Sequence, residues 1–181
     1  MPKHFDLLIF DWDGTLADST AAIVDALRDA SHDLNLPPPS DQASRDIIGL
    51  ELLTALRVLF GDLDPDLMQA VAGRYKHHYN ARSAEIQLFH GVEAALPALA
   101  DDGFMLAVAS GKGRRGLMRA IEQAEFTGLM LATRSSDDCF SKPHPQMLEE
   151  IMDELGTTPE RTLMIGDTTF DLQMAQNAGV A

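Results

Sequence analysis

Four short runs of apolar residues have the pattern of buried strands. They lie at residues 5–10, 104–109, 129–132 and 162–165, and none of them alternates with polar positions. Continuous apolar runs of this length are typical of parallel strands that are covered on both faces. We therefore expect a parallel sheet between two layers of helices.

Helical periodicity fills the stretches between the later runs. Within 113–125 and 144–155, apolar residues recur at spacings of three and four, which places them on one face of a helix. Strands that alternate with such helices are typical of right-handed crossover units. The pattern predicts an α/β fold with a doubly wound, Rossmann-like parallel-sheet core.

The long stretch after the first apolar run is almost wholly helical in pattern. Residues 17–34 have one apolar face, prolines follow at 37–39, and Asp64-Pro65 opens a further helical segment. We predict an α-helical cap domain of residues 17–83, inserted into a core domain of residues 1–16 and 84–181. A new apolar run begins as the chain stops, so we expect the C-terminal end of the core to be truncated.

The composition of the chain restricts the kinds of partner that the protein can bind. The 181 residues carry a formal net charge of −14, which repels nucleic acids and anionic lipid surfaces. The single cysteine cannot close an intrachain disulfide, and no apolar run approaches the roughly 20 residues of a membrane span. We expect a cytoplasmic protein without nucleic-acid or membrane partners, in which an anionic substrate needs a local positive charge or a metal ion.

Two carboxylates directly follow the first predicted strand. Asp11 and Asp13 stand at its carboxyl end, where ligand sites lie in open α/β sheets. Acids so close together raise each other's pKa unless something positive holds them, and Mg²⁺ is an oxygen-loving ion that can do so. A surface turn is the competing interpretation, because Asp and Gly are common in turns.

The ends of later elements carry further polar residues. A hydroxyl and free backbone N–H groups at Ser110 and Gly111 precede a predicted helix, which is a combination suited to a phosphate-sized anion. Lys142 opens the next helix, where the helix dipole disfavours a cation. Asp167 and Asp171 follow the fourth apolar run.

Taken in order, these motifs resemble the haloacid dehalogenase (HAD-like) hydrolase superfamily, in particular its phosphoglycolate-phosphatase-type members with a helical cap. The matching residues are Asp11, Asp13, Gly14, Thr15, Ser110, Lys142, Gly166, Asp167 and Asp171. The resemblance extends from Phe5 to Gly179 and implies a Mg²⁺-dependent phosphatase that hydrolyses a small phosphorylated metabolite through an aspartyl-phosphate intermediate.

The resemblance also implies individual roles. Asp11 is the expected nucleophile, Asp13 the general acid and base, and Lys142 a third catalytic residue. Asp11, Asp13 and Asp167 are the expected Mg²⁺ ligands, Asp13 through its backbone carbonyl. Asp171 is expected to orient Lys142 or a metal-bound water, and direct ligation of the metal is the alternative. The substrate-binding residues are expected to be Thr15, Ser110 and Gly111.

Several alternatives stay open at this point. A phosphomutase of the same superfamily needs the same first step, and a phospho-aspartate signalling module also uses clustered acids and a lysine on a parallel sheet. Arg45, Arg114 and Arg115 are candidates for a second anionic group on the substrate, although exposed surface arginines are the simpler interpretation.

Overall fold

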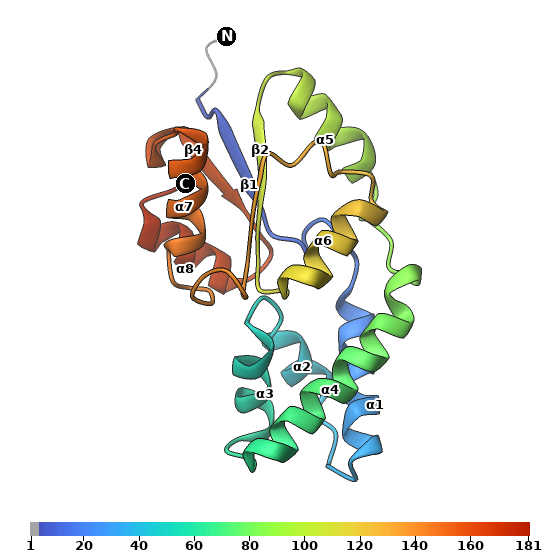
Figure 1. Ribbon diagram of the computed structural model, residues 1–181. Helices are drawn as coiled ribbons and strands as arrows, with labels where there is room; N and C mark the ends of the chain where they lie inside the picture. The colour runs from blue at the N-terminus through green and yellow to red at the C-terminus, as the bar shows by residue number, and fades with distance from the viewer. Residues whose placement is uncertain (1–3) are drawn as a thin grey trace.

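The computed structural model describes residues 4–181 as a parallel sheet with helices on both faces and a helical layer at one end (Figure 1). The sheet consists of β1 (Leu7–Phe10), β2 (Met105–Ser110), β3 (Ala132–Ser135) and β4 (Thr162–Ile165) in the order β3-β2-β1-β4. All pairs are parallel, and Leu7 of β1 stands opposite Met105 of β2 and Thr162 of β4. The predicted fold class is confirmed.

Alternate residues of β1 enter two different cores. Leu7 and Ile9 pack against α7 (Gln146–Leu155) and α8 (Thr169–Ala178) on one face of the sheet. Leu8 and Phe10 pack on the other face, against α5 (Val92–Asp101) and α6 (Arg114–Gln123). Burial on both faces explains why β1 is continuously apolar.

Four helices between β1 and α5 form a layer of their own below the sheet (Figure 1). They are α1 (Thr20–Asp33), α2 (Asp41–Asp46), α3 (Leu52–Phe60) and α4 (Pro65–Arg82). A separate apolar cluster, which includes Leu27, Leu56 and Val71, holds them together. Asp64 caps α4 and Pro65 follows at the first helical position, as the sequence pattern predicts. The domain limits at 17 and 83 stay a prediction.

One strand lies elsewhere than the apolar pattern predicts. The run at 129–132 was expected to be a strand, whereas β3 spans Ala132–Ser135. Phe126 and Met130 instead pack in the core beneath α6. Because β3 is an edge strand, its Thr133 and Arg134 can stay partly exposed, and a polar edge strand has no continuous apolar signal.

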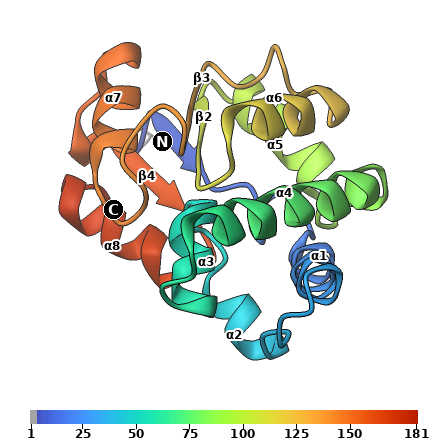
Figure 2. The same ribbon diagram turned by 60° about the horizontal axis from the view of Figure 1, so that its bottom comes forward.

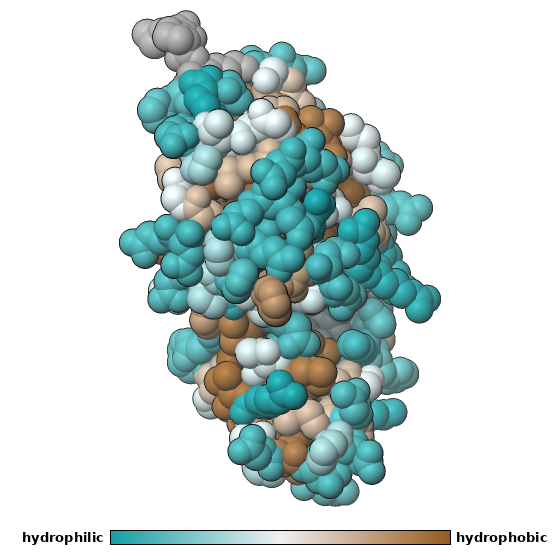
Figure 3. Space-filling view, turned by 60° about the vertical axis from the view of Figure 1, so that its left-hand side comes forward, coloured by the Kyte–Doolittle hydropathy of each residue, from teal (hydrophilic) through white to brown (hydrophobic). Residues whose placement is uncertain are grey.

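The surface differs between the two parts of the molecule. In Figure 3 the upper part is largely hydrophilic, whereas hydrophobic surface gathers in the lower, helical part. No helix among residues 4–181 combines the length and apolar character that a bilayer crossing requires.

Candidate active site

The candidate site lies where the carboxyl ends of the strands meet the helical layer (Figure 2). Asp11 follows β1, Ser110 ends β2, and Asp167 follows β4 by two residues. Because the strands are parallel, residues separated by more than 150 positions arrive at the same edge. The parallel topology thus brings Asp11, Ser110 and Asp167 to one edge of the sheet.

A buried ion triad forms the floor of the site. Lys142 Nζ lies 2.8 Å from Asp11 Oδ1 and 2.6 Å from Asp171 Oδ1, and all three side chains are buried. The other oxygen of Asp171 accepts hydrogen bonds from the backbone N–H and the hydroxyl of Thr168, which caps α8. Asp171 is therefore fixed by a helix cap, and it fixes Lys142 in turn.

Asp11 has the fewest hydrogen-bond partners of the three residues in the triad. Among the described residues, neither of its carboxylate oxygens receives a hydrogen bond of regular geometry, although Lys142 is within ion-pair distance. Burial raises the pKa of Asp11 to about 6, and Lys142 limits that increase. Two carboxylates likewise hold the pKa of Lys142 above its ordinary value, against the opposing effect of burial. At neutral pH Asp11 is therefore a carboxylate beside the ammonium group of Lys142.

Asp167 brings a further carboxylate to the same place. One oxygen each of Asp11, Asp167 and Asp171 lie within 4.8 Å of one another, which is compact enough to hold a metal ion. Thr15 donates its hydroxyl hydrogen to Asp167 Oδ1 at 2.9 Å. Gly14 has a φ of +88°, and a Cβ there would lie 2.3 Å from Asp167 Oδ2. The turn after β1 therefore needs glycine for its conformation and for this close approach.

Asp13 lies beside a lysine that the sequence did not single out. Lys112 Nζ is 2.8 Å from Asp13 Oδ2, and the hydroxyl of Tyr79, on α4, donates to Asp13 Oδ1 at 3.3 Å. Lys112 also donates to the Tyr79 hydroxyl at 2.9 Å. Although burial acts in the opposite direction, Lys112 lowers the pKa of Asp13 below its ordinary value. The side chain of Asp13 is thus an ionised carboxylate that contacts Lys112 of the core and Tyr79 of the cap.

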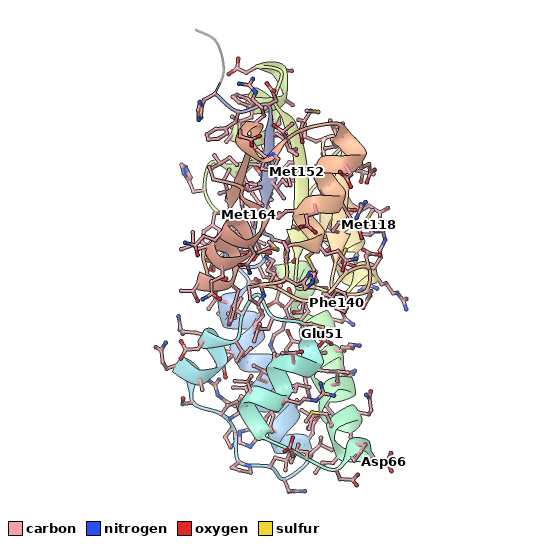
Figure 4. The ribbon with its side chains drawn as sticks, turned by 90° about the vertical axis from the view of Figure 1, so that its left-hand side faces the viewer. Glu51, Asp66, Met118, Phe140, Met152 and Met164 are labelled. Atoms are coloured by element: carbon pink, nitrogen blue, oxygen red, sulfur yellow. The ribbon has the colours of Figure 1, made fainter. Side chains whose placement is uncertain are left out.

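The cap reaches the core through a short loop before α3. A Cβ on Gly111 would lie 2.2 Å from the carbonyl oxygen of Gly49, so the two loops touch backbone to backbone. On the other side, the backbone N–H of Glu51 donates to the hydroxyl of Ser141 at 3.0 Å. Figure 4 shows Glu51 directly below Phe140 at this junction. The loop of the cap is thus seated between the Ser110 loop and the Lys142 loop.

A cavity of about 610 Å³ lies between cap and core above the acids. Asp11, Asp13, Ser110 and Gly111 line its core side, and Tyr79 is among the residues of its cap side. Apolar cap residues make up much of the remaining lining: Ile23, Leu27, Ile47, Ile48, Leu50, Leu52, Leu53, Ala55 and Ala72. This volume suits a small organic molecule whose polar end meets the acids.

Sequence reasoning found the floor of the site and missed part of its wall. The sequence patterns gave no catalytic role to Lys112 or Tyr79. The signal for Lys112 was its place two residues after Ser110 in a chain with few lysines. Tyr79 has no comparable signal, because its contact depends on how α4 lies against the core.

The three candidate arginines, Arg45, Arg114 and Arg115, differ in their position relative to the cavity. Arg45 is exposed and lies outside the residues that line the cavity. Arg114 is paired with Asp138 at 3.0 Å, whereas Arg115 lines the cavity.

The fold and the site together define an α/β enzyme with a helical cap over an acidic pocket at the carboxyl edge of a parallel sheet. Residues 8–181 match the family model described as haloacid dehalogenase-like hydrolase. The chain belongs to this family, as its motifs predict.

Individual relatives extend over nearly the whole chain. It is 35% identical over 182 residues to a protein of Dickeya dadantii named "Probable phosphatase IndB", covering 97% of this chain and 78% of that protein. It is 30% identical over 188 residues to a phosphoglycolate phosphatase of Aliivibrio fischeri, covering 99% and 83%. A haloacid dehalogenase-like hydrolase of Bacteroides fragilis superimposes with a TM-score of 0.90 at 27% identity, over 98% of this chain and 85% of that structure.

Proposed function

We propose that this protein hydrolyses a small-molecule phosphate monoester in two steps, with Asp11 as the nucleophile and Mg²⁺ as the cofactor. Family membership and relatives named as phosphatases support the reaction class. The observation that carries the proposal is the Asp11 carboxylate: it is buried, ionised at neutral pH, short of hydrogen-bond donors, and open to the cavity.

The side chains fit a divalent cation. Four carboxylates, those of Asp11, Asp13, Asp167 and Asp171, face only two ammonium groups, so the site carries a local excess of two negative charges. Asp11 also has buried oxygens without regular donors. Hard carboxylate oxygens are the ligands that Mg²⁺ prefers.

Within this proposal, Asp11, Asp167 and the backbone carbonyl of Asp13 hold the cation. When bound, Mg²⁺ would neutralise charge on the phosphoryl group and on the nucleophile. Both oxygens of Asp171 are engaged, by Lys142 and by the Thr168 cap. We therefore keep Asp171 as the residue that orients Lys142.

In the first step, a carboxylate oxygen of Asp11 bonds to phosphorus while the bond from phosphorus to the substrate oxygen breaks. Asp13 gives its proton to the departing alkoxide and becomes a carboxylate. In the second step, water attacks the phosphorus of the aspartyl phosphate and loses its proton to Asp13, while the bond from phosphorus to Asp11 breaks, which releases inorganic phosphate and regenerates the Asp11 carboxylate. The proton therefore returns to Asp13 in every cycle, and the ion pair with Lys112 represents the ionised half of that cycle.

The remaining phosphoryl oxygens need donors. Ser110 and the backbone N–H of Gly111 lie at the end of β2, beside the beginning of α6, and both residues line the cavity. Lys142 brings a fixed ammonium group next to Asp11. Thr15 is directed at Asp167, so its contribution to substrate binding runs through the position of that carboxylate.

A phosphate-release screen over a panel of monoesters, with purified protein and Mg²⁺, tests the proposal. We expect turnover that Asp11→Asn abolishes, whereas Asp153→Asn, an exposed change on α7, leaves it unaltered. With p-nitrophenyl phosphate, whose leaving group needs no proton, Asp13→Ala should let a phosphorylated protein accumulate, which intact mass spectrometry detects as an added phosphoryl group. Full turnover in Asp11→Asn would overturn the proposal. Phosphoryl transfer to a second substrate hydroxyl in place of water would identify a mutase, and an aspartyl phosphate stable for hours would identify a signalling module.

A further inference from the structure

Cations without an acidic partner gather at the cavity. Among residues 4–181, eight Lys and Arg side chains form ion pairs with Asp or Glu, which leaves five without such a partner. Three of those five, Lys76, Arg115 and Arg119, line the cavity of the candidate site. In a chain with a net charge of −14, acids to pair with are abundant, so this clustering is not explained by a shortage of partners.

Two of these cations follow the helical repeat of α6. Arg115 and Arg119 are four residues apart, so they lie on the same face of the helix, which is the face toward the cavity. Like charges at this spacing destabilise a helix. The spacing of the pair itself thus offers α6 no stabilisation, and its position on the cavity face points to a role outside the helix.

The third cation comes from the opposite wall. Lys76 is on α4, in the turn that precedes Tyr79, and it too lines the cavity. Arg119 is only half-buried and also lines a neighbouring cavity of about 530 Å³ beside Trp12. Cap and core thus face each other with positive charge outside the acidic floor.

Within residues 4–181, the carboxylates along the same wall form no ion pair with these cations. Glu51 accepts hydrogen bonds from the backbone N–H groups of Leu53 and Thr54 at the beginning of α3. Asp137 accepts from the backbone N–H of Arg114 at 2.7 Å. Both acids are committed to backbone donors.

We propose that Arg115, Arg119 and Lys76 form a subsite for a second anionic group of the substrate, a carboxylate or a second phosphate. The inference rests on the proposed phosphatase function and specifies its substrate class. Guanidinium groups bind planar or tetrahedral oxyanions through paired N–H donors, and two of them on one helix face suit a single such group. The subsite lies beyond the phosphoryl position, so it acts on substrate recognition and leaves the bond-breaking groups alone.

A matched pair of substrates tests the subsite. 3-Phosphoglycerate and glycerol 3-phosphate share a carbon skeleton and a phosphate position, and they differ in a carboxylate against a neutral hydroxymethyl group. Fructose 1,6-bisphosphate against fructose 6-phosphate tests a second phosphate in the same way. We expect the protein to favour the anionic member of at least one pair by about tenfold or more in kcat/KM.

Substitutions of the individual cations test whether they cause the preference for anionic substrates. Arg115→Met and Arg119→Met should each raise KM for the favoured anionic substrate by about tenfold, with little change in kcat and none for its neutral partner. Arg119→Lys should restore part of the affinity. Arg57→Met is the matched control, because Arg57 is also exposed and unpaired but lies on α3 outside the cavity lining.

Binding separates a failure of the subsite from a failure of the proposed function. Calorimetric titration of Asp11→Asn with the same pairs measures affinity without turnover. Preferential binding of the anionic members, lost in Asp11→Asn/Arg119→Met, supports the subsite even if the wild type releases no phosphate. Equal kcat/KM and equal affinity within both pairs would overturn the subsite while leaving phosphatase activity intact.

Discussion

Replacing Lys142 with methionine removes the only positive charge on the floor of the site. The ammonium group lies 2.8 Å from Asp11 and 2.6 Å from Asp171, and the side chains of all three residues are 1% exposed or less. Removing one partner of a buried ion pair typically costs about 3–5 kcal/mol, because the charge left behind stays uncompensated. A domain of this size unfolds with roughly 5–15 kcal/mol, so the loss is a large part of its stability.

Chemical denaturation in metal-free buffer measures this loss directly. At pH 8 we expect Lys142→Met to lower the free energy of unfolding by about 3–5 kcal/mol. The corresponding decrease in melting temperature is roughly 6–20 °C. Asp153→Asn is again the control, and the double variant Lys142→Met/Asp171→Asn should recover part of the loss, because it removes one stranded carboxylate.

The sign of the pH dependence follows from Asp11. Its pKa is already raised from 3.8 to about 6, and without Lys142 it rises further, because Lys142 is the group that lowers it. A carboxyl whose folded-state pKa is raised stabilises the fold at low pH and loses that contribution as pH rises through the raised value. The deficit of the variant should therefore shrink between pH 8 and pH 5. A variant as stable as the wild type at pH 8, or a deficit that grows toward pH 5, would refute this account.

Three further predictions concern the cofactor, the acid and the cap. Saturating Mg²⁺ should raise the melting temperature, by an amount that corresponds to about 2.7 kcal/mol at a hundredfold excess over Kd, and Asp167→Asn should reduce the shift. Lys112→Met should raise the pKa of Asp13, because Lys112 is the main group that lowers it, and should therefore shift the pH profile of alkyl-phosphate hydrolysis toward higher pH; an unchanged profile would exclude this effect of Lys112. Gly111→Ala should lower kcat/KM while leaving the melting temperature of the core within a few degrees, because its Cβ would meet the Gly49 carbonyl at 2.2 Å and displace the cap loop. A Gly111→Ala variant with unchanged kcat/KM would contradict the seating of that loop.

Both β3 and β4 lie at the edges of the sheet, but the apolar strand β4 could be predicted from the sequence and the polar strand β3 could not. The apolar runs mark β1, β2 and β4 because both faces of these strands need apolar side chains. β3 is an edge strand that begins at the end of its predicted run and continues into Thr133 and Arg134. Local periodicity carries no information about which strand ends up at the edge.

The floor of the site was predictable for a topological reason. Once the strands are known to be parallel, the residues after β1, β2 and β4 must converge, whatever the rest of the chain does. The wall formed by Lys112 and Tyr79 has a different origin, because it depends on the angle between α4 and the core, which arises from packing over many residues. Contacts between a cap helix and the core produce no regular residue spacing, so they cannot be predicted from the sequence pattern.

The distribution of charge differs between the floor and the wall of the site. The chain has only four lysines, and three of them lie at or beneath the cavity, although the molecule as a whole carries a net charge of −14. Lys142 and Lys112 each neutralise a carboxylate, so they make the acids compatible with one another and add little to the field outside. Among residues 4–181, Arg119 and the other unpaired cations of the cavity lining have no such partner, so their charge stays available to an anionic group of the substrate. We therefore expect an acidic protein of this kind to bind an anionic substrate through its unpaired cations, while its paired cations neutralise the catalytic acids.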